Sequence, residues 1–321
     1  MCAILEAEHL VKAYRQKIRK EKGAFWKSKF EVKQAVKDIS FTIKEGEAVG
    51  LVGMNGAGKS TLIKLLLGIL SPDDGEAKMF GKNSFQYRKK NAGHIGVNFG
   101  QKSSLVWDLP FLYSLELNKK IYQVPDFQFE KTLDELDKFL QVKELLNIPV
   151  RVMSLGQRMK CEFAAISIHA PKLLILDEST IGLDILIKKK IEEYLKYINE
   201  KRKVTVLFST HDLAEMERIC SRFILVNDGK IILDDQVDNI CALSMYSYLS
   251  VKIVGEYSCQ IGEMDGLMVI GRTGNEWKIR IDRAVLSEQE AMAGLIKRMP
   301  VENISIEKQS LEDFIYHMVR E

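Results

Sequence analysis

One short glycine-rich run does most to limit what this chain can fold into. The run, GMNGAGKST, spans Gly53–Thr61. Residues 48–52 before it are apolar and predict a buried strand, whereas residues 62–67 after it predict a helix. A glycine loop between a strand and a helix can turn backbone N–H groups inward around an anion, and the start of the helix adds unpaired donors. The run therefore predicts a phosphate-binding P-loop within an α/β fold.

Two side chains of this loop carry the chemistry that P-loops perform on a nucleoside triphosphate. Lys59 can reach the β- and γ-phosphates, and the hydroxyl of Ser60 can bind Mg²⁺. The alternative is a glycine-rich turn that contains Lys-Ser by chance. The fixed positions of the loop and both flanking elements agree with the first interpretation, so we expect a nucleotide site here.

Length and composition bound the remaining possibilities. A chain of 321 residues is long for one domain, and we expect two. Hydrophobic residues make up 46%, enough for a substantial core, and the net charge of +3 gives no sign of a nucleic-acid partner. We expect no signal peptide, and no apolar stretch reaches the roughly 18–20 residues that cross a bilayer, so a partner must supply any membrane part. The cysteines form no CxxC pair, which predicts reduced thiols rather than zinc ligands or disulfides: Cys2, Cys161, Cys220, Cys241 and Cys259.

Strands alternate with helices over most of the chain. Residues 36–43, 94–99, 172–177 and 204–209 predict strands, and the helices between them imply a largely parallel sheet with helical cover. Residues 3–10 predict an edge strand.

A helical region and a second domain follow from the same patterns. Residues 111–148 predict helices, with Pro125 as a break and with one apolar stripe formed by Phe129, Leu133, Leu136 and Leu140. The character of the chain changes near residues 238–246. Residues 246–321 predict a small separate α+β domain, with strands near 249–254, 267–270, 277–281 and 301–307 and a helix at 287–298.

An acidic pair follows the apolar strand at residues 172–177. Asp177 is placed to bind Mg²⁺, and Glu178 is placed to activate an attacking water. An acid pair in isolation is usually a solvated strand end. Downstream of a P-loop in the same sheet, it predicts the catalytic edge of that sheet.

Three further segments carry polar groups that allow two interpretations each. Gln101 can contact a metal or the attacking water, or it is an ordinary polar loop residue. His211, just past a strand, can hydrogen-bond a γ-phosphate, or it is a surface histidine. Ser154 and the N–H of Gly156 can bind a phosphate at a helix N-terminus, or Ser154 is a simple helix cap.

The order of these five motifs resembles the nucleotide-binding subunit of ABC transporters over about residues 3–235. The resemblance implies a P-loop NTPase core with an antiparallel subdomain in residues 1–238, a helical subdomain at about 101–168, and an accessory C-terminal domain at 246–321. It implies that ATP and Mg²⁺ are bound and that ATP is hydrolysed. The implied catalytic residues are Lys59, Glu178 and His211; the implied metal ligands are Ser60, Gln101 and Asp177. The implied nucleotide-binding residues are Tyr14 (stacking on adenine), Gly53, Asn55, Gly56, Ala57, Gly58, Lys59, Ser60, Thr61, Gln101, Ser154, Gly156, Gln157 and Asp184.

The sequence departs from the usual family pattern in three places. Met153 and Leu155 replace the leucine and the first glycine of the LSGGQ signature, but the serine and second glycine remain. Ser179 stands where a proline usually follows the acid pair. The third departure is a basic insertion at residues 15–34, with eight Lys or Arg against two Glu, which is absent from many members.

The insertion, the segment at 100–110 and the segment at 154–160 together resemble a bacterial subgroup whose ATPase subunits pair with separate exporter-type permeases. The tail SLEDF at 310–314 is similar to the accessory C-terminal domain of many such ATPases. We therefore expect two identical subunits to form a head-to-tail dimer. We expect this dimer to bind permease subunits at the cytoplasmic face of the membrane. The insertion can contact anionic lipid or the permease, or it is a solvated charged loop.

Three rival functions stay open at this point. An importer would use the same chemistry. A soluble ABC-type ATPase that acts on ribosomes or DNA usually carries two nucleotide domains, long coiled coils or zinc clusters, whereas this chain has one P-loop and neither of the other features. A P-loop kinase would not need the LSGGQ-like segment.

Overall fold

The computed structural model describes residues 2–17, 30–100, 102–210, 212–242, 246–254 and 265–307. The chain divides into two compact units, Met1–Gln236 and Val237–Glu321. Among the described residues, no helix is long and apolar enough to cross a membrane.

A six-stranded sheet forms the centre of the first unit. Its strands are β3 (Ala48–Val52), β6 (Ile95–Phe99), β7 (Leu173–Asp177), β8 (Thr205–Ser209), β9 (Arg222–Asn227) and β10 (Lys230–Gln236), in the order β10-β9-β3-β8-β7-β6. All neighbouring pairs are parallel except β9 and β10, which form an antiparallel hairpin. Every residue of β3, β7 and β8 is buried, because helices or a second sheet cover both faces of these strands; this explains their uninterrupted apolar sequences.

A second sheet in the first unit is antiparallel. It consists of β1 (Ala3–Lys17), β2 (Phe30–Lys44), β4 (Asp74–Met79) and β5 (Lys82–Asn83), in the order β2-β1-β4-β5. The prediction that residues 3–10 form an edge strand was wrong, because β1 pairs with β2 on one side and with β4 on the other. Alternation in a sequence reports a half-buried strand, but it carries no information about how many neighbours the strand has.

The core of the first unit lies between these two sheets. Helix α1 (Lys59–Leu66) runs through it, with Leu62, Ile63, Leu65 and Leu66 buried against residues of both sheets. The P-loop helix is thus held on several sides. Its start, where the loop meets it, is fixed by the same packing. The short helix α2 (Ser84–Asn91) follows β5.

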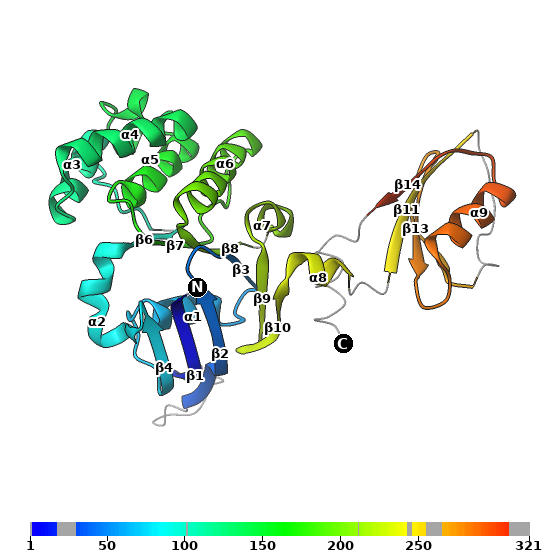
Figure 1. Cartoon of the computed structure of the whole chain (residues 1–321), viewed down its shortest axis with the longest axis horizontal. Coiled ribbons are helices and arrows are strands. Elements are labelled where there is room, and N and C mark those ends of the chain that lie inside the picture. Colours follow the sequence, from blue (N-terminus) through cyan, green and yellow to red (C-terminus); the bar gives the residue numbers. More distant parts are fainter. Residues whose placement is uncertain are drawn as a thin grey trace, which may run out of the picture. The chain divides into compact units, whose positions relative to one another are not determined.

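The other helices of this unit lie on the opposite side of the six-stranded sheet from the antiparallel sheet (Figure 1). They are α3 (Phe111–Ile121), α4 (Asp126–Leu140), α5 (Leu155–Ser167), α6 (Ile185–Arg202) and α7 (Leu213–Ile219). Short 3-10 turns lie at 92–94, 143–145 and 150–152. The predicted apolar stripe of α4 is confirmed, since Phe129, Leu133, Leu136 and Leu140 are all buried.

The second unit begins with α8 (Val237–Ala242) and contains a four-stranded antiparallel sheet. The sheet has the order β12-β13-β11-β14, and α9 (Glu288–Arg298) packs on one face through Ala291 and Leu295. The alternating pattern of β13 places Trp277, Ile279 and Ile281 in that core. The strands are β11 (Tyr246–Ile253), β12 (Leu267–Thr273), β13 (Glu276–Asp282) and β14 (Val301–Glu307). The tail at residues 310–314 lies outside the described residues.

Candidate nucleotide-binding site

The P-loop backbone takes conformations that only glycine adopts without strain. Gly56 has φ +84° and Gly58 has φ +107°. A Cβ on Gly58 would lie 2.2 Å from the carbonyl oxygen of Ala35 on β2. Gly58 is also the N-cap of α1 and supplies no side-chain cap, so the first N–H groups of this helix are left for another acceptor. These features fit an anion placed in the loop.

Lys59 is folded back into the loop. Its side chain is 6% exposed, and Nζ donates hydrogen bonds to the carbonyl oxygens of Gly53 at 2.6 Å and Met54 at 3.3 Å. Burial lowers the pKa of the Lys59 ammonium, and the charges of Glu178 and Asp177 act in the opposite direction. A buried cation that faces two carboxylates is suited to bind polyphosphate oxygens.

A cavity of about 330 Å³ opens onto this loop. It brings together groups that are distant in sequence: Tyr14, Lys33, Ala35, Asn55, Gly56, Gly58, Lys59, Ser60, Thr61 and Glu178. Tyr14 is 37% exposed, so its ring is available for stacking. The sequence analysis did not predict that Lys33 lies at this site. Lys33 belongs to the basic insertion and pairs with Tyr14 where β1 and β2 run side by side.

The acidic pair lies at the same edge of the sheet as the P-loop. β3, β8 and β7 are neighbours and parallel, so their carboxyl ends meet. Asp177 is buried, and its Oδ1 accepts a hydrogen bond from the hydroxyl of Ser209 at 2.7 Å. Glu178 follows in a left-handed conformation, φ +54°, with its N–H donated to the Ser209 carbonyl at 2.9 Å. Glu178 is also one of the residues that line the cavity at the P-loop.

Two predicted site residues, Gln101 and His211, lie outside the described residues, as does most of the basic insertion. Their described neighbours are at the same edge of the sheet. The N–H of Gly100 donates to the Asp177 carbonyl at 2.9 Å. Thr210 directly follows β8, whose last residue pairs in register with Asp177.

The LSGGQ-like segment starts helix α5. Ser154 caps this helix: its hydroxyl accepts from the N–H of Gln157 at 3.2 Å, while the Gln157 side chain accepts from the N–H of Ser154 at 2.9 Å. Asp184 caps α6 in a similar way through the N–H groups of Leu186 and Ile187. Neither Ser154, Gly156, Gln157 nor Asp184 is among the described residues that line the P-loop cavity of the same chain.

A buried carboxylate missed by the sequence analysis fixes the loop after residue 101. Glu162 on α5 is buried; it accepts hydrogen bonds from the hydroxyls of Ser103 and Ser104 and from the N–H of Ser104 at 3.0 Å. The loop is thereby tied to the helix that Ser154 begins. A single acid within the apolar run of α5 was the available signal in the sequence.

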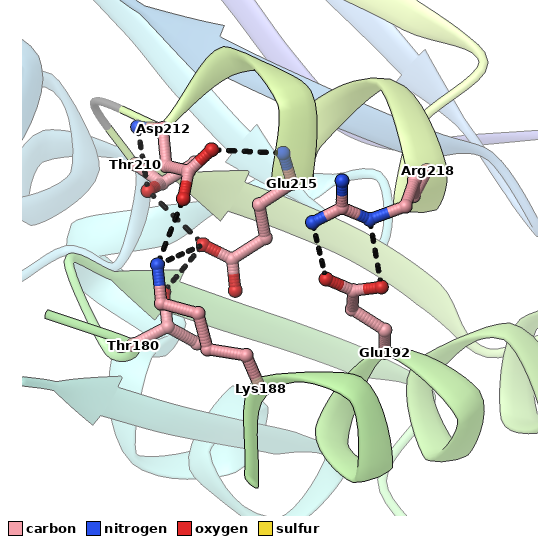
Figure 2. A network of polar contacts seen from close by, with 7 residues as sticks. All are labelled: Thr180, Lys188, Glu192, Thr210, Asp212, Glu215 and Arg218. Atoms are coloured by element: carbon pink, nitrogen blue, oxygen red, sulfur yellow. Dashed lines mark hydrogen bonds and ion pairs between the residues drawn. The ribbon is translucent and has the colours of Figure 1, made fainter. Parts of the chain in front are cut away.

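A second network missed by the sequence analysis includes Thr180, two residues after the acid pair (Figure 2). It joins the turn after Glu178 to the start of α7 through Glu215, and it includes Lys188 on α6. None of its members stands out from sequence alone.

A larger cavity, of about 510 Å³, lies at the other end of the strands. Its lining includes Lys172, Arg202 and Lys203, which lie where α5 and α6 end. Cations are favoured at helix C-termini, so these charges need no ligand to explain them. We place the functional site at the smaller cavity, where the P-loop and Glu178 converge.

The residues present fit a magnesium ion that is shared with a nucleotide. Asp177 and Ser60 offer the carboxylate and hydroxyl oxygens that Mg²⁺ prefers. Among the described residues, no group of three or more His, Cys, Asp or Glu side chains could hold a metal unaided. A Mg²⁺ ion here would therefore need phosphate oxygens to complete its coordination.

Comparison with protein families gives a match between residues 36–181 and the ABC transporter family model. A probable sulfate/thiosulfate import ATP-binding protein, CysA of Chlorella vulgaris, is 32% identical over 199 residues, or 62% of this chain and 84% of that protein. The ATP-binding protein NatA of Bacillus subtilis is 29% identical, over 67% of this chain and 87% of NatA. The bacitracin transport protein BcrA of Bacillus licheniformis is 25% identical, over 89% of this chain and 92% of BcrA.

Solved structures agree on the fold. The chain superimposes on cbiO1 of Clostridium perfringens, part of the transporter complex cbiONQ, with a TM-score of 0.61, 25% identity, and coverage of 75% of this chain and 91% of cbiO1. The dimeric post-hydrolysis state of the ATP-binding cassette MJ0796 with ADP and Pi gives a TM-score of 0.62 at 24% identity, over 73% of this chain and 98% of that chain. The predicted α/β fold class is confirmed.

Proposed function

Because this chain belongs to the family of ABC transporter ATP-binding subunits, and is thus an ATPase that powers a membrane permease, we propose that it drives export as a head-to-tail homodimer at the cytoplasmic face of the membrane. The observation that carries the proposal is the cavity in which the P-loop, Lys59 and Glu178 meet. Its groups are those that bind a nucleoside triphosphate and activate water.

The proposed roles follow from position in that cavity. Backbone N–H groups from Gly53 to Thr61 and the ammonium of Lys59 neutralise the phosphates, and the Tyr14 ring stacks on the adenine. Ser60, Asp177 and Gln101 would hold Mg²⁺, which would supply charge neutralisation at the phosphate oxygens. Glu178 orients and deprotonates the attacking water, and His211 hydrogen-bonds the γ-phosphate.

The signature residues supply the second half of a site in the partner subunit. Ser154, Gly156 and Gln157 sit at the N-terminus of α5, where the helix dipole favours an anion, yet they do not line the cavity of their own chain. In a twofold dimer each such segment can cover the partner's P-loop. Asp184, at the start of α6, would lie at the same interface.

Export is favoured over import because the match to a protein named for import spans fewer residues than the match to BcrA. The match to BcrA covers 293 residues, more than the first unit of Met1–Gln236 contains, so it extends into the second unit. The match to the import protein CysA covers 199 residues. We therefore assign residues 1–238 as the ATP-binding domain and 246–321 as an accessory domain shared with transporters of the BcrA kind.

The test is nucleotide-driven dimerisation of the Glu178→Gln variant. Removing the carboxylate that deprotonates water should stop turnover while ATP and Mg²⁺ still bind, so the variant accumulates as an ATP-bound dimer. Light scattering after size exclusion, with and without Mg-ATP, measures this directly. Glu178→Gln that hydrolyses ATP at the wild-type rate would rule out the assigned role.

Two controls bracket that result. Lys59→Ala should show neither dimer nor turnover, because the buried cation at the phosphates is gone. Lys64→Ala changes an exposed lysine on the same helix and should behave as wild type.

Recovery of the chain with membranes only when permease subunits are co-expressed separates the transport function from a soluble ABC-type ATPase.

A further inference from the structure

The burial of Glu215 on α7 is not explained by a gain in folding stability. Its side chain is 0% exposed, and its Oε1 has no hydrogen-bond partner among the described residues. Burial raises the pKa of its carboxyl. An acid that is buried and incompletely hydrogen-bonded costs folding free energy, so it needs another reason to be there.

The other carboxylate oxygen of Glu215 joins two segments of the proposed active site (Figure 2). Oε2 accepts a hydrogen bond from the hydroxyl of Thr180 at 2.8 Å and a longer one from Thr210 at 3.4 Å. Thr180 is two residues past Glu178, and Thr210 directly precedes His211. One oxygen therefore links the turn after Glu178 to Thr210 at the end of β8.

Lys188 extends the contact to helix α6. Its Nζ lies 3.7 Å from Glu215 Oε2 and donates a 2.8 Å hydrogen bond to Asp212 Oδ2, which lowers the pKa of Asp212. Lys188 is on the first turn of α6, four residues after its cap, Asp184. The start of α6 is thus fixed to the same network.

We infer that Glu215 is a positioning residue for ATP hydrolysis, which holds the segment after Glu178 and the segment before His211 in one arrangement through Thr180 and Thr210. The inference rests on the proposed roles of Glu178 and His211. Glu215 does not line the P-loop cavity, so it acts on the alignment of the attacking water and not on nucleotide affinity.

The test is a kcat-against-KM comparison on the full-length chain. Glu215→Ala should lower kcat for ATP by about 10- to 100-fold and change KM by less than about twofold, because misplacement of the water-activating groups affects only the chemical step. Glu215→Gln should restore most of kcat, since the amide oxygen still accepts from Thr180. Thr180→Val, which removes one hydrogen bond with little change of shape, should lower kcat alone and add little to Glu215→Ala.

A second link between α6 and α7 provides a matched control. Arg218 donates to Glu192 at 2.7 and 2.9 Å without touching either threonine. The double variant Glu192→Gln/Arg218→Gln should lower the melting temperature but keep kcat within about twofold of wild type. The inference is overturned if folded Glu215→Ala or Thr180→Val keeps wild-type kcat, or if the control loses as much kcat. Wild-type turnover by Glu178→Gln would instead reject the role proposed for Glu178.

Discussion

At the residue scale, Gly58 is the position where an added methyl group should prevent the P-loop from binding nucleotide. Alanine there would hold φ near +107° and bring Cβ to 2.2 Å from the Ala35 carbonyl, a backbone atom that cannot rotate away. We predict that Gly58→Ala costs about 2 kcal/mol or more of folding stability and abolishes nucleotide binding. Urea unfolding and binding of a fluorescent ATP analogue measure the two effects.

Gly81 gives the matched comparison for that substitution. It also has a positive φ, +70°, but a Cβ there would meet nothing within 4 Å, and it lies outside the P-loop. Gly81→Ala should cost about 1 kcal/mol for the left-handed conformation alone and leave nucleotide binding intact. Equal effects of the two substitutions would contradict the role given to the contact with Ala35.

At the element scale, local patterns were sufficient for the parts of the site that lie within one segment. The strand, loop and helix around Gly53–Thr61 and the strand before Asp177 were predictable because each depends on its own sequence period. The alignment of their carboxyl ends followed from the parallel sheet. The α/β fold class could be predicted for the same reason.

Contacts between elements were not predictable. The interior position of β1, the approach of Lys33 to the cavity, and the bonds that Glu162 and Glu215 make all depend on which segments meet in space. A buried acid looks like a solvated one in a single sequence until its partners are located. Residues that position the site are therefore harder to find than those that form it.

His169 is expected to make folding stability depend on pH. It links the end of α3 to the end of α5 and the start of β6. Its Nε2–H donates to the Ile95 carbonyl at 3.0 Å, and its ring stacks on Tyr122 at 3.9 Å. Burial lowers the pKa of His169 to about 4, from an ordinary value near 6.5. As pH falls below 6.5 the unfolded chain binds a proton that the folded chain does not, so stability declines until about pH 4.

The expected loss over that pH range is up to about 3 kcal/mol. His169→Gln removes the titrating group and should flatten this part of the stability profile, although it also weakens the stack at neutral pH. Urea unfolding at pH 8, 6.5, 5.5 and 4.5 provides the comparison. Parallel pH profiles for wild type and variant between pH 6.5 and 4.5 would contradict the assigned origin of the acid sensitivity.

At the scale of the whole molecule, the role proposed for the signature segment needs a second subunit, because this segment does not line the P-loop cavity of its own chain. Leu155 is the side chain that can test this. It is 42% exposed at the start of α5, where the family pattern has glycine, and a carboxylate at a helix N-terminus is tolerated by the helix itself. Leu155→Asp should therefore fold but repel the phosphates of a nucleotide in the partner's cavity, whereas Leu155→Ala should stay active.

Mixing two inactive variants then shows whether the sites are shared between identical subunits. Lys59→Ala destroys the P-loop half, and Leu155→Asp destroys the signature half. A mixed dimer concentrates both defects in one site and leaves the other site intact. Since one of the two sites in a mixed dimer is intact, mixed dimers isolated through two different tags should hydrolyse ATP at roughly half the wild-type rate. Differently tagged chains establish that mixed dimers form. If they form and no activity returns, a site shared across a homodimer is excluded, because each chain would then need its own P-loop and its own signature segment.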